Sequence, residues 1–343
     1  MQETRNRNSI LFLSACVLVF FLADLLIGSV YIPAGSIFDI LTGGSDSDSV
    51  FSRIVLNFRL PKAITACLAG AALSVCGLLM QTLFRNPLAG PFVLGINSGA
   101  SLGVAIVLLS AGISSEAAVG AFTKLGIIFS ASIGAGLILL LVVLVSKSIK
   151  DSITLLILGL MFGHITSAIE GILQYFSRAE SLQGFIIWSL GSFSNVVWDE
   201  LAILAPFIIA GIVTAFYLSK PLNALLLGEN YANSMGVNVK RSRTIVIIAT
   251  GVLAGSITAF CGPIAFLGIA VPHLTRNLLN TSDHKILIPT VCLTGATLAL
   301  ICDVIAQMPG TGRTLPVNAV TSLFGAPVVI WVILRQRKRK FSF

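Results

Sequence analysis

Long uncharged, apolar runs alternate along the chain with short polar connections. The uncharged runs cover residues 8–23, 63–84, 86–115, 125–146, 152–169, 201–219, 244–275, 286–302 and 314–334. A helix needs about 20 apolar residues to cross about 30 Å of hydrocarbon. The pattern therefore predicts at least nine membrane-spanning helices and an all-α fold.

The run 244–275 is too long for one crossing. As a single helix its 32 residues would extend about 48 Å, at about 1.5 Å per residue. Gly262 and Pro263 interrupt the run, so we predict a break there and ten helices in all. Because charge returns at Arg276, we expect the second piece to be broken, tilted or extended into the cytoplasmic interface.

Composition supports a membrane protein and excludes a soluble domain. Hydrophobic residues make up 56% of the chain and charged residues 10%, with a mean hydropathy of +0.97, whereas soluble domains are about 25% charged. No stretch resembles a separate soluble domain, so we expect one transmembrane domain over residues 1–343. The six cysteines lack metal-ligand spacing, which predicts small buried side chains and no metal site.

Most Lys and Arg residues lie in alternate connections, which predicts that both termini are cytoplasmic. The net charge of +8 then serves to anchor that face against anionic lipid, and no nucleic acid partner is needed. The exceptions fall on the translocated side: Arg53, Arg59, Lys62, Arg178 and Arg313. They either reach the lipid headgroups or form a docking site for an acidic partner.

A weak internal repeat relates residues 61–111 to residues 243–276. Each contains an apolar helix, a Gly/Pro interruption and a Gly-containing helix, and five spans separate their starts. The two halves would therefore have opposite topology. Inverted repeats with interrupted helices at their junction are typical of transporters.

Few ionisable residues lie within the predicted spans, and each is a functional candidate because burial of charge in a membrane is costly. Asp24, Glu170 and Asp303 lie toward the outer helix ends, where a structural or interfacial role is expected. His164 lies deeper and could line a pathway. The chain has no phosphate-binding loop, zinc-protease motif or serine elbow, so we do not expect an enzyme.

The polar segment 220–243 follows the sixth span and predicts a short amphipathic helix from Ala224 to Met235, ended by Gly236. A short helix held parallel to the membrane suits rigid coupling to a soluble subunit. An ordinary interfacial helix is the alternative.

Several motifs occur in one colinear order over residues 55–335. They are Arg59-Leu60-Pro61-Lys62, Arg85-Asn86-Pro87-Leu88-Ala89, Leu94-Gly95-Ile96-Asn97-Ser98-Gly99, Leu227-Gly228-Glu229, Tyr231-Ala232, Met235-Gly236-Val237, Gly262-Pro263-Ile264, Val271-Pro272-His273 and Leu315-Pro316-Val317. Together they resemble the FecCD family of ABC-importer permeases for iron complexes and cobalamin.

This resemblance implies a type II ABC-importer permease fold in the bacterial inner membrane, and a homodimer with its pathway at the dimer axis. Two cytoplasmic ATPases, which use ATP and Mg, would bind below and an extracytoplasmic binding protein above. The chain itself would bind no cofactor. The implied cargo is a bulky metal chelate, most often an iron-siderophore, with cobalamin or haem as alternatives.

Four sets of residues follow from the resemblance by position and, for Arg53, Arg313 and His164, from the charge pattern and depth described above. The ATPase-coupling set is Leu227, Gly228, Glu229, Tyr231, Ala232, Met235 and Gly236. The binding-protein docking set is Arg53, Arg59, Lys62 and Arg313. The cytoplasmic gate lies near Ser148 and Ser152, and the pathway candidates are Gln81, Asn97, Ser98 and His164.

Two positions depart from the family pattern. Gly90 stands where the family often has Asp, and Gln307 where it often has Arg. The second departure removes a docking charge that Arg313 would replace. A reading from another class also remains: an ion-coupled secondary transporter of a small solute that uses Asp303, Glu170 or His164 as ion sites.

Overall fold

The computed structural model describes residues 2–28, 30–44, 49–110, 124–149, 151–308 and 314–340. Within these ranges the regular structure is entirely helical, as predicted. The elements are α1 (Gln2–Leu26), α2 (Ala34–Thr42), α3 (Val50–Ile54), η1 (Val55–Arg59), α4 (Leu60–Leu83), η2 (Pro91–Leu94), α5 (Ile96–Ser110), α7 (Lys124–Ser148), α8 (Ser152–Phe176), α9 (Ala179–Ser189), α10 (Trp198–Tyr217), α11 (Ser219–Leu226), α12 (Glu229–Ser234), α13 (Val239–Cys261), α14 (Leu267–Leu279), α15 (His284–Ala306) and α16 (Val317–Lys340).

Among the described residues, seven helical segments are long and apolar enough to cross a membrane. The shorter apolar helices α5 and α16, together with α14, complete the expected ten. The predicted break is confirmed, since α13 ends at Cys261 and α14 begins at Leu267. α14 has only 13 residues, about 20 Å of helix, so it does not cross the membrane alone.

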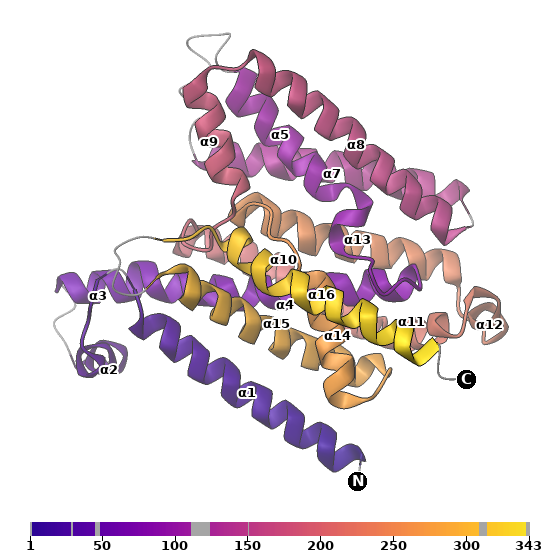
Figure 1. Ribbon diagram of the computed structural model, residues 1–343, viewed down its shortest axis with the longest axis horizontal. Helices are drawn as coiled ribbons and strands as arrows, with labels where there is room; N and C mark the ends of the chain where they lie inside the picture. Colours follow the sequence, from indigo (N-terminus) through magenta and orange to yellow (C-terminus); the bar gives the residue numbers. More distant parts are fainter. Residues whose placement is uncertain are drawn as a thin grey trace.

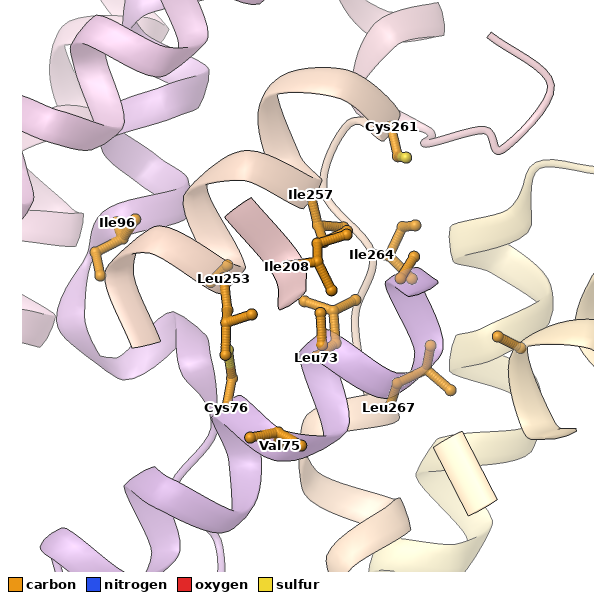
Figure 2. Packing of buried hydrophobic residues seen from close by; sticks show 14 of the residues in the cluster. Leu73, Val75, Cys76, Ile96, Ile208, Leu253, Ile257, Cys261, Ile264 and Leu267 are labelled. Atoms are coloured by element: carbon orange, nitrogen blue, oxygen red, sulfur yellow. The ribbon is translucent and has the colours of Figure 1, made fainter. Parts of the chain in front are cut away.

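Helix α4 is the centre of the molecule and packs against α10, α13, α14 and α15 (Figure 1). Its sequence is rich in Ala and Gly, and 83% of the apolar window of its segment is buried. Figure 2 shows Leu73 and Cys76 of α4 beside Ile208 of α10 and Leu253 of α13. Small side chains allow such close approach of backbones, which drives helix association in lipid.

Helices α5, α7, α8 and α9 form a second group along one side of α13 (Figure 1). α5 and α7 meet at glycines, where a Cβ on Gly134 would overlap the carbonyl oxygen of Gly99. On the same helix, a Cβ on Gly136 would meet nothing within 4 Å. Only the first of these two glycines is therefore required by packing.

Short elements lie at the two ends of the bundle. α2 and α3 lie at one end; α11, α12, the start of α1 and the end of α16 lie at the other (Figure 1). Between the ends, α1, α7, α8, α10 and α16 expose many large apolar side chains. Such a belt is unfavourable in water and matches a hydrocarbon environment.

Candidate functional site

The predicted coupling segment contains two short helices rather than one. α11 ends at Leu226 and α12 begins at Glu229, so the expected single helix from Ala224 to Met235 is wrong. Gly228 lies between them with φ 111°, a left-handed conformation that a helix cannot include and that L side chains rarely adopt. Gly236, with φ 81°, follows the end of α12 as predicted.

The segment is amphipathic in the way the sequence predicts. Leu227, Tyr231 and Met235 are spaced four residues apart and are 64%, 51% and 60% exposed. Ala232 is fully buried and packs with a small cluster of Ala224, Leu225, Val237 and Val239. One side therefore attaches the segment to the bundle, and the other presents three large apolar side chains.

Helix α11 is fixed to the bundle through Asn223. Its Nδ2 donates to Asp283 Oδ1 at 2.7 Å, and its Oδ1 accepts from the His284 backbone N–H at 2.9 Å and from His284 Nδ1 at 2.7 Å. His284 Nε2 lies 2.8 Å from Thr82 Oγ1 on α4. The hydrogen bond from Asn223 lowers the pKa of Asp283, because it stabilises the carboxylate.

Helix α12 is attached through Arg243 of α13. This buried guanidinium pairs with Glu229 Oε1 at 2.5 Å through Nη2 and donates to the Ile149 carbonyl at 2.9 Å through Nη1. Asp151, two residues after Ile149, caps α8 by accepting from the Thr154 backbone N–H at 2.8 Å. The first residue of α12 is thus joined to the connection between α7 and α8.

That connection is where the sequence places the cytoplasmic gate. Ser148 is the last residue of α7 and is exposed, and Ser152 is the first residue of α8. The structure therefore brings the predicted gate and the predicted coupling segment close together. Sequence reasoning missed Arg243 as the link, although its charge beside an apolar run was visible.

The loop after α4 contacts α14. His273 Nε2 donates to the Pro87 carbonyl at 2.6 Å, and Arg276 Nη1 donates to Gln81 Oε1 at 2.8 Å. Arg85 begins the loop with φ 47°. Motifs almost 200 residues apart are thus one structural unit, which makes their joint occurrence a specific signal.

Comparison with known proteins decides the family. The model of the FecCD transport family matches residues 16–335. This chain belongs to the FecCD transport family. Among its curated relatives, the vitamin B12 import system permease protein BtuC of Klebsiella pneumoniae is 34% identical over 99% of this chain and 97% of the relative. The hemin transport system permease protein HmuU of Yersinia pestis is 34% identical over 94% and 96%.

Solved structures agree with this assignment. A putative metal-chelate type ABC transporter in an inward-facing conformation matches with a TM-score of 0.82 and 28% identity, over 95% of this chain and 98% of the other. PsaBC from Streptococcus pneumoniae, in complex with Fab, matches with a TM-score of 0.51 and 17% identity, over 87% and 94%. The second match shows a shared fold only.

The pathway residues predicted for this FecCD chain do not form one lining. Gln81 is buried and hydrogen-bonded to α14, so its placement in a pathway is corrected. Asn97 is buried and accepts from Thr258 Oγ1 at 2.9 Å. Ser98 is half-buried on α5, and His164 is exposed on α8. The roles of the last three residues stay predictions.

Two of the four docking residues do not face outward. Arg59 is 5% exposed and donates to the carbonyls of Leu25 and Leu26 at the end of α1 and of Val30 beyond it. Lys62 is 7% exposed. The docking assignment of both is corrected, because their cationic groups are hydrogen-bonded or ion-paired inside the bundle. Arg53 is exposed at the same end of the molecule, and Arg313 lies outside the described residues.

The Lys62 ammonium belongs to a buried ionic cluster that joins α1, α4 and α15. Its Nζ lies 2.7 Å from Asp303 Oδ2 and 3.3 Å from Asp24 Oδ1, and Gln307 Nε2 donates to Asp24 Oδ1 at 2.6 Å. Asp24 is 0% and Asp303 3% exposed. Asp24 and Asp303 therefore fit the structural rather than the interfacial alternative, and Gln307 has a structural partner in Asp24.

Proposed function

We propose that this chain is the membrane-spanning subunit of an ATP-driven importer for a metal chelate. The observation that carries the proposal is the apolar surface of Leu227, Tyr231 and Met235 at one end of a lipid-compatible bundle. A surface of this kind, on a short helix pinned to the bundle, fits a groove of a soluble partner. Family membership supports an ABC ATPase as that partner.

The mechanism follows from the two attachments of the segment. Two ATPases, which hydrolyse ATP with Mg, seat the α12 segments of two copies of the chain and displace them when they close. The displacement opens and shuts a pathway at the axis of a homodimer. The coupling is a free energy shared between the nucleotide sites and the pathway, so the chain needs no catalytic residue of its own.

The cargo is a bulky metal chelate, and an iron-siderophore is the favoured member of the class. Relatives named for vitamin B12 and hemin import, and a structural neighbour titled as metal-chelate type, support the class. Cobalamin and haem remain alternatives, because these relatives are themselves named for vitamin B12 and for hemin. A binding protein that docks near Arg53 would select the cargo.

The surface variants Tyr231→Asp and Met235→Asp test the ATPase contact. Each places a charge on the apolar surface, so the ATPase encoded with this chain should no longer copurify, and ATP-driven uptake into proteoliposomes should stop. Tyr31→Asp is the matched control and should leave copurification unchanged. Tyr31 is 85% exposed and lies just before α2, which is at the opposite end of the molecule from α12 (Figure 1).

The same proteoliposomes separate the importer from an ion-coupled transporter. The importer takes up ferric siderophore only with the binding protein outside and ATP with the ATPase inside. Uptake that follows a proton or sodium gradient without the ATPase would overturn the proposal and favour ion coupling through Asp303 or Glu170.

A further inference from the structure

The buried guanidinium of Arg243 connects three segments: helix α13, the predicted coupling helix α12, and the predicted gate connection after α7. Arg243 belongs to α13, contacts the first residue of α12 through Glu229, and contacts the end of the α7 region through the Ile149 carbonyl. It is 4% exposed, whereas Arg241 on the same helix is exposed. The two arginines therefore sit in different environments within one helical turn.

Local helix stability does not explain why an arginine is buried at position 243. The start of α13 already has a cap, since Asn238 Oδ1 accepts from the Arg241 backbone N–H at 3.0 Å. Burial of a charged side chain is costly unless its partners are in place. The partners of the Arg243 guanidinium include the two groups that it bridges, the Glu229 carboxylate and the Ile149 carbonyl.

Open space surrounds α12 on both sides of this link. A cavity of about 800 Å³ lies between α12, the end of α7 and the start of α13, and its lining includes Ser146, Asn230 and Arg243. A second cavity of about 620 Å³ is lined by Arg85, Asp151 and Tyr231, among others. Toward these cavities α12 meets little packed volume, whereas Ala232 packs against α11 and the start of α13. The bridging guanidinium is therefore the contact that leads from α12 toward the end of α7.

We propose that Arg243 is a positioning residue that transmits displacement of α12 to the connection between α7 and α8. The inference rests on the proposed function and adds a specific mechanical link to it. A planar guanidinium has several donors in a fixed fork, so it holds the Glu229 carboxylate and the Ile149 carbonyl together. A lysine ammonium at the same place is a compact charge on a flexible stem and cannot fix both in one geometry.

Transport stoichiometry provides the first test. In proteoliposomes with the partner ATPase and binding protein, Arg243→Lys should keep assembly and ATP hydrolysis but lower the chelate transported per ATP about tenfold, a typical size for a coupling between sites. Arg241→Lys is the matched control and should keep the wild-type ratio. An Arg243→Lys complex that also keeps the wild-type ratio overturns the inference.

Glu229→Gln supplies an independent variant on the partially exposed side of the link. It removes the charge that Arg243 pairs with and leaves the side-chain shape. A lower transport ratio with unchanged ATPase copurification therefore supports the link even if Arg243→Lys fails to fold, and a wild-type ratio contradicts it. Residues that act through one another show non-additive effects. The double variant should therefore be no worse than either single variant, and fully additive losses would contradict a shared link.

Site-specific fluorescence separates transmission from a purely structural effect. Asn230→Cys on α12 and Ser148→Cys at the end of α7 replace exposed residues, whereas the native thiols in the described residues are buried or half-buried. With wild-type Arg243, both labels should respond to ATP. With Arg243→Lys, the label at position 230 should respond and the label at 148 should not.

The outcomes distinguish the two proposals. If the wild-type complex shows no ATP-driven uptake, the proposed function fails and the link fails with it. If uptake is ATP-driven and position 148 responds equally in both backgrounds, the link alone is wrong.

Discussion

The sequence places Arg59 near the end of a membrane-spanning helix, but it does not show in which direction the side chain points. Its guanidinium satisfies carbonyl groups left free where α1 ends. A cation at a membrane-flanking position looks the same in sequence whether it points outward to a partner or inward to such carbonyls. Family resemblance therefore identified the residue as important and gave it the wrong neighbours.

The variants Arg59→Ala and Arg53→Ala should have different effects. Arg59→Ala removes charge-assisted hydrogen bonds worth about 1.5 to 3 kcal/mol each and should lower the free energy of unfolding by about 3 kcal/mol. Arg53→Ala, at an exposed position, should lower the free energy of unfolding less than Arg59→Ala does and should weaken association with the binding protein. Detergent-based unfolding and a binding assay on the folded fraction check both. A stability loss confined to Arg53→Ala would contradict the assignment.

Lys62→Met keeps the length of the side chain but removes its charge, and it should strongly lower the free energy of unfolding. It leaves Asp24 and Asp303 close together without their shared cation. Removal of one partner from a buried ion pair costs about 3 to 5 kcal/mol. Asp303→Asn keeps the Lys62–Asp24 pair and serves as the milder comparison in the same unfolding measurement. Equal losses for both variants would argue against a cluster balanced by Lys62.

At the scale of elements, the sequence predicted a helix break only where excessive length and a Gly-Pro pair occurred together. The break at Gly262 was visible because the run was too long and contained Gly-Pro. The break at Gly228 was missed because a lone glycine in a polar stretch is compatible with a helix, and only its φ of 111° shows otherwise. The links from Asn223 and Arg243 join residues far apart along the chain, and no local pattern encodes them.

The pair Gly134→Ala and Gly136→Ala tests the packing of α5 on α7. The first change places a methyl group against the Gly99 backbone and should reduce both the folded yield and the melting temperature. The second meets nothing within 4 Å and gains about 0.5 to 1 kcal/mol of helix propensity, so it should be neutral or stabilising. Similar losses from both changes would mean that the two helices do not meet at Gly134.

The attachment of α11 should weaken in acid. The pKa of Asp283 lies below its ordinary value of 3.8, chiefly because Asn223 donates to the carboxylate. A depressed folded-state pKa contributes stability that is complete above the unfolded value and is lost as pH falls through the folded value. The wild type should therefore protect α11 amides from hydrogen exchange more than Asp283→Asn does at pH 5 to 7, and the difference should vanish below the depressed pKa.

On the scale of the whole molecule, the lengths of the uncharged runs and the Gly-Pro break predicted the helical class and the ten helices. It could not show that α4 lies at the centre, because lipid-facing and buried helices are both apolar. The inverted repeat, the homodimer and the gate are still predictions.

The two ends of the bundle should be reachable from opposite sides of the membrane. Arg53→Cys, near α2 and α3, should react with a membrane-impermeant maleimide outside intact cells, whereas Asn230→Cys on α12 should react only after permeabilisation (Figure 1). The positive-charge pattern predicts this orientation. Labelling of both from the same side would reject the topology.

Glycines in left-handed conformations bound α12 on both sides, at positions 228 and 236. The six residues of α12 therefore form a cassette that can be exchanged as a unit without disturbing the helices that cross the lipid, provided that Glu229 and Ala232, which hold it to α13 and α11, are kept. Exchange of this cassette between related permeases should then transfer the preference for a particular motor subunit and leave the choice of cargo unchanged.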